Sequence, residues 1–315
     1  MTDSLSTTGS ATPTGSLTGE PDTAPLYVRI SNLAAVLIPF LGVIAAAVLL
    51  WGQALSWVDL GLLLGMYILS GLGITIGYHR LFTHRSFEAP GAVKATLIAL
   101  GSMAVEGPLL RWAAQHRRHH QHSDRVGDPH SPHLHGDGIL GMLKGLWHAH
   151  MGWMFEMHPI GMKKYVPDLL ADRLIVTSSN LFSVWVVLGA LLPTLVGGLL
   201  TMSWMGALLG FLWGGAVRVF LIHHVTFSIN SVCHLWGTRP FRSRDHSRNN
   251  PIFGVLGFGE GWHNNHHAFP ASARHGLRWW EIDLGYWVIR LLAALGLAWN
   301  VRVPAGDVMA EKMAR

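Results

Sequence analysis

The chain has 315 residues, of which 50% are hydrophobic and only 13% are charged, and its mean hydropathy is +0.32. This composition excludes an ordinary soluble domain and predicts an integral membrane protein. The formal net charge is +5, but the basic residues form no tract, which argues against a nucleic-acid-binding surface, and a single cysteine excludes a disulfide framework or a cysteine-held metal centre.

The N-terminal segment, residues 1–26, is rich in Ser, Thr, Gly and Pro and contains no Lys or Arg. We therefore expect a disordered tail, not a signal peptide. The remainder, residues 27–315, is predicted to form one membrane domain. Four apolar stretches in it are long enough to cross a bilayer as helices, at about residues 33–52, 60–77, 180–200 and 204–227. The short break within each pair predicts two helical hairpins and an all-α fold.

Two polar segments follow the hairpins. In the first, 78–179, the apolar stretch Ala92–Val105 is too short to span and is predicted to be interfacial or re-entrant. The second ends in the apolar stretch Trp279–Leu297, whose charges Glu281, Asp283 and Arg290 predict an amphipathic helix on the membrane surface.

The basic residues predict the orientation of the chain. Of 23 Lys and Arg, 11 lie in 78–179 and 10 after residue 228, and the remaining two are Arg29 and Arg218. By the positive-inside rule, both termini and both polar segments face the cytoplasm, where they form a helical cap over the spans. We expect a multi-pass protein of a bacterial cell membrane.

Histidines recur in three short motifs within the polar segments. Spacings of i, i+3 and i+4 place three imidazoles on one helix face in two of them. In the first motif the two histidines are five residues apart, about 140° around a straight α-helix, so they are expected to bracket a two-metal site or straddle a bend. The motifs are His79 with His84, then His116, His119 and His120, and finally His263, His266 and His267.

Asn230 and His234, four residues apart at the end of the fourth span, complete a set of nine histidines and one asparagine. Nine imidazoles are too many for one ion and suit two ions with four or five nitrogen ligands each. Iron, copper, zinc and nickel all accept imidazole, so ligand type leaves the metal open. Any one motif alone is typical of a solvated basic helix end, whereas three on one side of the membrane favour a metal centre.

The motifs resemble those of membrane-bound fatty acyl desaturases of the Δ9, stearoyl type. The matching segments are His79-Arg-Leu-Phe-Thr-His84, His116-Arg-Arg-His-His120, Asn230-Ser-Val-Cys-His234 and His263-Asn-Asn-His-His267, and the resemblance runs from about Gly73 to Asp283. It implies two irons held directly by the nine histidines, with Asn230 acting through a bound water. It also implies four membrane helices under a cytoplasmic helical cap.

The implied reaction uses O2 and two electrons to form a cis double bond, at Δ9, in a saturated C16–C18 acyl chain. Zinc has no redox chemistry and does not suit it. Gly107, Ala114 and Glu156 stand where animal members use polar and basic groups to hold coenzyme A, which favours a membrane lipid over coenzyme A as the acyl carrier. Electrons are expected from a separate ferredoxin or cytochrome b5-like donor with its reductase, docking on the basic cytoplasmic face.

Four further residues lie close to the motifs. Trp112 and Trp262 are candidates for the wall of an acyl channel, with ordinary packing as the alternative, and Asp128 and Glu260 for carboxylates that orient ligand imidazoles. For Asp128, an Asp-Pro turn is the alternative. The histidines at 130, 133, 135, 148 and 150 are expected to be loop residues.

Two other functions compete with desaturation. A hydroxylase uses the same site but returns oxygen to the chain instead of removing a second hydrogen. A metal transporter is the alternative outside enzymes, but transporters place ionisable residues near the bilayer midplane, and no span here carries an acidic residue well inside it.

Overall fold

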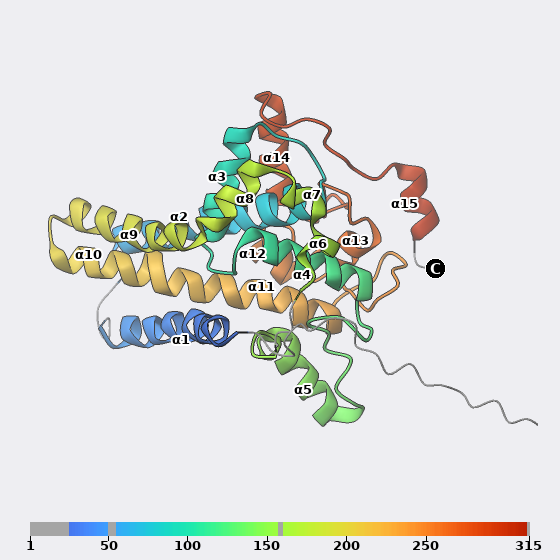
Figure 1. Cartoon of the computed structure of the whole chain (residues 1–315), viewed down its shortest axis with the longest axis horizontal. Coiled ribbons are helices and arrows are strands. Elements are labelled where there is room, and N and C mark those ends of the chain that lie inside the picture. Colours follow the sequence, from blue (N-terminus) through green and yellow to red (C-terminus); the bar gives the residue numbers. More distant parts are fainter. Residues whose placement is uncertain (1–24, 50–54, 157–159, 314–315) are drawn as a thin grey trace, which may run out of the picture.

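The computed structural model describes residues 25–49, 55–156 and 160–313, and over these ranges the chain forms helices, loops and isolated β-bridges (Figure 1). The predicted all-α class is confirmed. The predicted tail lies outside the described residues up to residue 24, and the first helix begins at Leu26.

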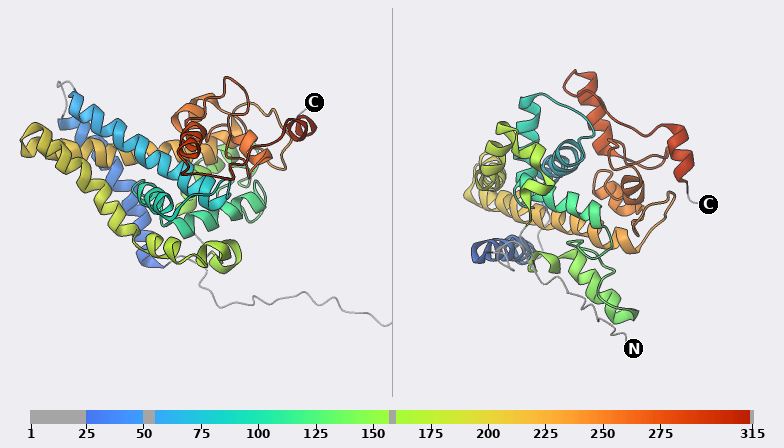
Figure 2. Two further views of the ribbon diagram at one scale, coloured as in Figure 1. Left: turned by 90° about the horizontal axis from the view of Figure 1, so that it is seen from above. Right: turned by 45° about the vertical axis from the view of Figure 1, so that its right-hand side comes forward.

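Four helices are long and apolar enough to cross a membrane, and they run side by side in Figures 1 and 2. The second and fourth extend past their predicted ends, and each includes a π-helical stretch. They are α1 (Leu26–Leu49), α2 (Trp57–Leu72) with η1 (Gly73–Thr83), α9 (Phe182–Thr201), and α10 (Trp204–Gly210) with η3 (Phe211–Val217) and α11 (Arg218–Leu235). The pairing of these helices as membrane hairpins under a cytoplasmic cap stays a prediction.

Small residues allow α9 and α10 to pack closely. A Cβ added to Gly197 would lie 2.3 Å from the carbonyl oxygen of Gly206, and one added to Gly210 would lie 2.2 Å from that of Pro193. Larger side chains would separate the two helices, so this contact depends on glycine, as is common between membrane helices.

Most of the remaining helices pack around the ends of the spans that lie next to η1. The buried core there joins η1, α3, α4 and α14 through side chains such as Tyr78, Ile98, Leu109 and Ile289. The helices are α3 (Gly91–Ser102), α4 (Leu109–His122), α5 (Gly138–His150), η2 (Gly152–Met154), α6 (Met162–Tyr165), α7 (Pro167–Leu170), α8 (Arg173–Asn180), α12 (Pro251–Leu256), α13 (His263–Ala268), α14 (Leu284–Ala294) and α15 (Gly306–Lys312).

The predicted surface helix near the C-terminus is shorter than expected. Helix α14 begins at Leu284, after Asp283, whose carboxylate accepts a hydrogen bond from the Tyr286 amide at 2.9 Å. Both Glu281 and Asp283 are buried, because they bind other protein groups instead of forming a polar outer face. The expectation that Glu281 and Asp283 form the polar face of this helix is therefore wrong, and its position at the membrane surface stays a prediction.

Candidate metal centre

The structure gathers the nine histidines into two clusters. In each cluster, one ring nitrogen from every histidine lies within 4.8 Å of those of the other members. The five-histidine cluster contains His79, His84, His116, His120 and His266, and the four-histidine cluster contains His119, His234, His263 and His267. Asn230 lies one helical turn before His234 on α11 and lines the adjoining cavity.

Each HxxHH motif contributes to both clusters. On α4, His116 and His120 enter the five-histidine cluster, while His119 enters the four-histidine cluster. On α13 the pair four residues apart, His263 and His267, joins the four-histidine cluster, and the histidine between them joins the other. The two helices thus alternate their imidazoles between two neighbouring centres, which their assignment to one shared face did not anticipate.

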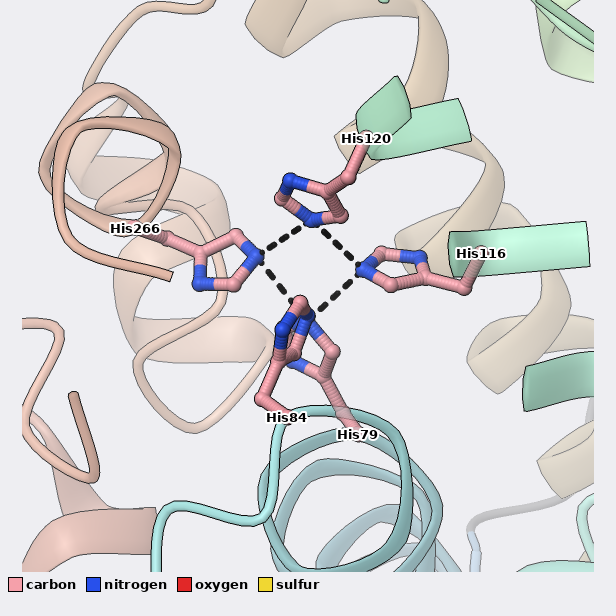
Figure 3. A group of neighbouring side chains, drawn as sticks. All are labelled: His79, His84, His116, His120 and His266. Carbon is pink, nitrogen blue, oxygen red and sulfur yellow. Dashed lines mark hydrogen bonds between the residues drawn. The ribbon is translucent and has the colours of Figure 1, made fainter. Parts of the chain in front are cut away.

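In the five-histidine cluster, four Nε2 atoms form a closed ring (Figure 3). The Nε2 atom of His79 lies 3.0 Å from that of His116 and 3.1 Å from that of His266, and the ring closes through His120 at 3.0 and 2.9 Å. His84 enters from the same chain segment as His79. Four nitrogens at these separations can all face one central ion.

The π-helix η1 brings His79 and His84 together. Its backbone hydrogen bonds join residues five apart, and the last one runs from the His84 amide to the His79 carbonyl at 3.0 Å. Five residues therefore make about one turn instead of about one and a half, and both imidazoles reach the same cluster. The prediction for a straight α-helix does not apply here, because the segment is π-helical and brings both histidines to one cluster instead of bracketing two.

Two arginines within the histidine motifs hold η1, α4 and the loop before α14 together. Arg80 is fully buried and donates to Asp283 at 2.9 Å and to the Ala273 carbonyl at 2.8 Å. Arg117 on α4 forms a two-pronged ion pair with Asp168 and donates to the carbonyl of Thr83 at 3.0 Å. These charge-assisted bonds tie η1 to α4 and to the loop before α14.

Four carboxylates accept hydrogen bonds from cluster histidines. Glu260 lies 2.5 Å from Nδ1 of His79, and Asp128 lies 2.9 Å from Nδ1 of His119. Both contacts have the geometry expected of an orienting carboxylate. The remaining two, each at 2.8 Å, were not predicted and join Asp124 to His234 and Asp245 to His267. In all four pairs the Nδ1 atom is engaged and Nε2 is left to face the cluster.

The electrostatics of the metal-free site favour neutral imidazoles. Burial, and then the charge of neighbouring imidazoles, holds the pKa of His116, His120 and His266 well below the usual range. Burial also acts to lower the pKa of His119, but the charge and hydrogen bond of Asp128, together with the charges of Asp124 and Asp245, outweigh it, so this pKa is raised. Burial alone would raise the pKa of the Asp128 carboxyl, yet the same pair holds it below its usual range.

The donor set fits metal ions. The Nε2 atoms of His84, His119 and His267 are buried and have no hydrogen-bond partner in the protein, a costly state that a bound cation would relieve. Adjacent nitrogens around a six-coordinate ion with bonds of about 2.1 Å lie about 3.0 Å apart, which matches the ring in the five-histidine cluster.

A cavity of about 430 Å³ adjoins both clusters. His79 and His116 of one cluster and His263 of the other line it, and it reaches Tyr27 near the start of α1. Trp112 lines it too and stacks on His116 with ring centroids 5.0 Å apart. An apolar chain of several methylene groups fits a cavity of this size and composition.

Trp262 does not line this cavity. Its indole nitrogen donates to the Ile282 carbonyl at 2.7 Å, and its ring covers Gly254, where an added Cβ would lie 2.7 Å from the indole. Trp262 is therefore a packing residue, which was the alternative interpretation.

Sequence reasoning missed Glu106, a buried carboxyl in the cavity wall. Its Oε2 atom accepts from the Trp112 indole at 3.0 Å, while Oε1 has no hydrogen-bond partner, and burial raises its pKa to about 7. The residues on either side, Val105 and Gly107, both have positive φ, at 63° and 100°. The strained backbone at Val105 places the Glu106 side chain in the wall.

Two other histidines lie close to the clusters: His130, which was expected to be a loop residue, and His275, for which no role was predicted. His130 is buried and stacks on His119, with centroids 4.3 Å apart. His275 is buried 4.6 Å from the His266 ring, and neither of its ring nitrogens has a hydrogen-bond partner. His148 and His150 lie on helix α5 and not in a loop, because α5 extends to residue 150.

Comparison with known proteins places these features in one family. A sequence model of the fatty acid desaturase family matches residues 54–302. The chain is 47% identical over 277 residues to a hex-5-enoyl-(acyl-carrier protein) acetylenase of Moorena producens, covering 87% of this chain and 86% of the relative.

Two further relatives carry different acyl carriers in their names. An sn-1 stearoyl-lipid 9-desaturase of Synechocystis is 37% identical over 264 residues, covering 82% of this chain and 77% of the relative. An acyl-CoA C20 Δ5-desaturase of Anemone leveillei is 36% identical over 279 residues, covering 87% and 83%.

Proposed function

Because the chain belongs to the fatty acid desaturase family and is an oxidoreductase, we propose that it forms a cis double bond in a saturated acyl chain of 16 to 18 carbons, at the Δ9 position, using O2 and two electrons. The observation that carries the proposal is the meeting of two all-nitrogen clusters at one apolar cavity. Family membership removes the support for a metal transporter.

The nine histidines are proposed to hold two iron ions, one in each cluster, with Asn230 acting through a water. When bound, a pair of redox-active ions supplies the oxidising power, from O2 and two electrons, that removal of two hydrogens from unactivated methylene groups requires. Zinc is unsuited because it has no redox chemistry.

The protein's own residues orient the site and the substrate. The four carboxylates fix the tautomer of their histidines and make the opposite nitrogens more basic. Mostly apolar side chains line the cavity, and Trp112, held by its stacking on His116 and its bond to Glu106, supports an acyl chain beside both clusters. Selectivity for one carbon–carbon bond then follows from position.

The acyl carrier is proposed to be a membrane lipid or coenzyme A, and the names of the relatives add acyl-carrier protein as a third choice. The identity to an acetylenase favours a second candidate reaction, in which two hydrogens are removed from an existing double bond. Electrons are proposed to come from a separate ferredoxin or cytochrome b5-like protein.

Expression in a host that lacks unsaturated fatty acids tests the proposal. Mass spectrometry of the host lipids and thioesters should find a Δ9 alkene and identify its carrier. A hydroxy acid without alkene would instead establish a hydroxylase, and an alkyne formed only from supplied alkenoic acid would establish an acetylenase.

A variant pair tests the metal assignment in the same host. His119→Ala should abolish the product, whereas His122→Ala, on the same helix but outside both clusters, should retain it. Product formation by His119→Ala at the wild-type level contradicts the two-iron assignment.

A further inference from the structure

Helix α5 reverses the polarity pattern of an ordinary surface helix. Its residues facing the body are small and buried, namely Gly141, Gly145 and Ala149. Its opposite face carries large apolar side chains that are mostly exposed: Ile139 at 76%, Leu140 at 65%, Leu143 at 52% and Trp147 at 59%. A helix in contact only with water normally turns such residues inward, so another phase or molecule covers this face.

The packing of α5 leaves no freedom to rotate this face inward. A Cβ added to Gly145 would lie 1.9 Å from the Pro132 carbonyl oxygen, and one added to Gly141 would lie 2.1 Å from that of Gly136. The loop before α5 therefore touches the helix backbone directly and fixes the large side chains outward.

The C-terminal end of α5 is fastened beside the ends of two spans. His150 lies 3.0 Å from the Ser231 hydroxyl, near the C-terminal end of α11, and 3.0 Å from Nδ1 of His224, nearer the middle of that helix. Shortly after α5, the Met154 carbonyl accepts a hydrogen bond from Asn32, which lies in the second turn of α1, at 2.8 Å. This end of α5 thus lies beside the second turn of α1 and the C-terminal half of the fourth candidate span.

From this anchor α5 runs obliquely past the start of α1, and its other end points away from the remaining helices, in Figure 1 and in the right-hand view of Figure 2. Exposed Tyr27 and Ile30 at the start of α1 continue the apolar surface that the spans present to lipid. The one charged side chain within α5, Lys144, is exposed on the flank of the apolar face, where its ammonium can reach the headgroups.

We propose that α5 lies in the interface of the lipid bilayer, with the face formed by Ile139, Leu140, Leu143 and Trp147 buried among the acyl chains. The partner is the lipid surface itself, because the apolar face continues the lipid-facing surface at the start of α1. The proposal does not depend on the reaction that the enzyme catalyses.

A single fluorescent probe tests the proposal. The only cysteine, Cys233, is fully buried, so the wild-type chain serves as the unlabelled control. Leu143→Cys places a label on the apolar face of α5, and Val308→Cys places one on α15, far from the spans (Figure 1). Both proteins are labelled with nitrobenzoxadiazole and reconstituted in phosphatidylcholine vesicles.

Lipids with a spin label near the headgroup should quench the probe at position 143 at least about twofold, and aqueous iodide should quench it little. The probe at position 308 should show the reverse. Equal quenching of both probes by iodide overturns the proposal. So does a probe at position 143 that neither quencher reaches, which would mean that a second copy or another protein covers the face.

Discussion

The two histidine clusters use the same ligand type but differ in their supporting charge. One carboxylate, Glu260, accepts from the five-histidine cluster, whereas three, Asp124, Asp128 and Asp245, accept from the four-histidine cluster. The cluster with fewer imidazoles therefore has more carboxylates hydrogen-bonded to them. Because a carboxylate makes its imidazole a stronger donor, the two centres are unequal, and the four-histidine cluster favours the more positive ion.

The largest expected effect comes from removing one ligand from each cluster. His119→Ala leaves three imidazoles in its cluster, while His84→Ala leaves four in the other. We expect both variants to lose product formation, but His119→Ala to fall from two bound irons to about one, and His84→Ala to retain nearly two. Elemental analysis of purified protein measures this. Equal metal loss in both variants would contradict the inequality.

Neutralising the supporting carboxylates should have the next largest effect. Asp245→Asn keeps the size of the side chain but removes the charge behind His267, so metal affinity and activity should fall about 10- to 100-fold. Titration of metal-free protein with Fe²⁺ measures the affinity.

Asp172→Asn is the matched control, because Asp172 caps α8 outside both clusters and asparagine caps helices equally well. If Asp172→Asn weakened iron binding as much as Asp245→Asn, the loss would not report on the cluster.

Acidification of the metal-free protein should change its stability, because the pKa values of the cluster histidines are shifted in opposite directions. The pKa values of His116, His120 and His263 are lowered on folding, so their contribution to stability is present above about pH 6.5 and is lost as the pH falls. His119 has a raised pKa, so its contribution is present below about pH 6.5 and is lost as the pH rises.

His84, His266 and His267 also have a lowered pKa, so the lowered groups outweigh the one raised group. The free energy of unfolding in detergent, and Tm with it, should decrease between about pH 6.5 and pH 5, by roughly 1.4 kcal/mol for each unit of lowered pKa. Circular dichroism in the presence of a chelator provides the measurement. A Tm that increases over this interval would show that protonation of His119 dominates.

The smallest expected effect concerns the cavity wall beside the five-histidine cluster. Trp112→Phe retains an aromatic ring against His116 but loses the hydrogen bond to Glu106, worth about 0.5–1.5 kcal/mol. The kcat/KM for the acyl substrate should fall roughly 2- to 10-fold with iron content unchanged. A loss of iron in this variant would assign Trp112 to the metal site instead of the substrate.

The part of the site that follows from local spacing could be predicted from sequence. Each histidine motif lies within or beside a single helical segment, and Asp128 and Glu260 lie close to a motif in the sequence. The lengths of the spans follow from the thickness of the bilayer. Asp245 could not be found because 22 residues of loop and helix separate it from His267. The π-helix could not be predicted because i, i+5 hydrogen bonding leaves no distinct hydrophobic period in the sequence. Glu281 and Asp283 were expected on a polar helix face, but they are buried and form hydrogen bonds with side chains from distant segments.

The carboxylates hydrogen-bonded to the cluster histidines also affect the stability of the metal-free protein. Four negative charges would match the four positive charges of the two divalent ions proposed for the clusters, so the filled centre would be close to neutral. Without the ions, like charges are left in a region shielded from water, and they repel the three segments that carry them, because Asp124 and Asp128 share the loop after α4. We therefore expect iron supply to control how much of this protein reaches its folded state in the membrane, before it limits turnover.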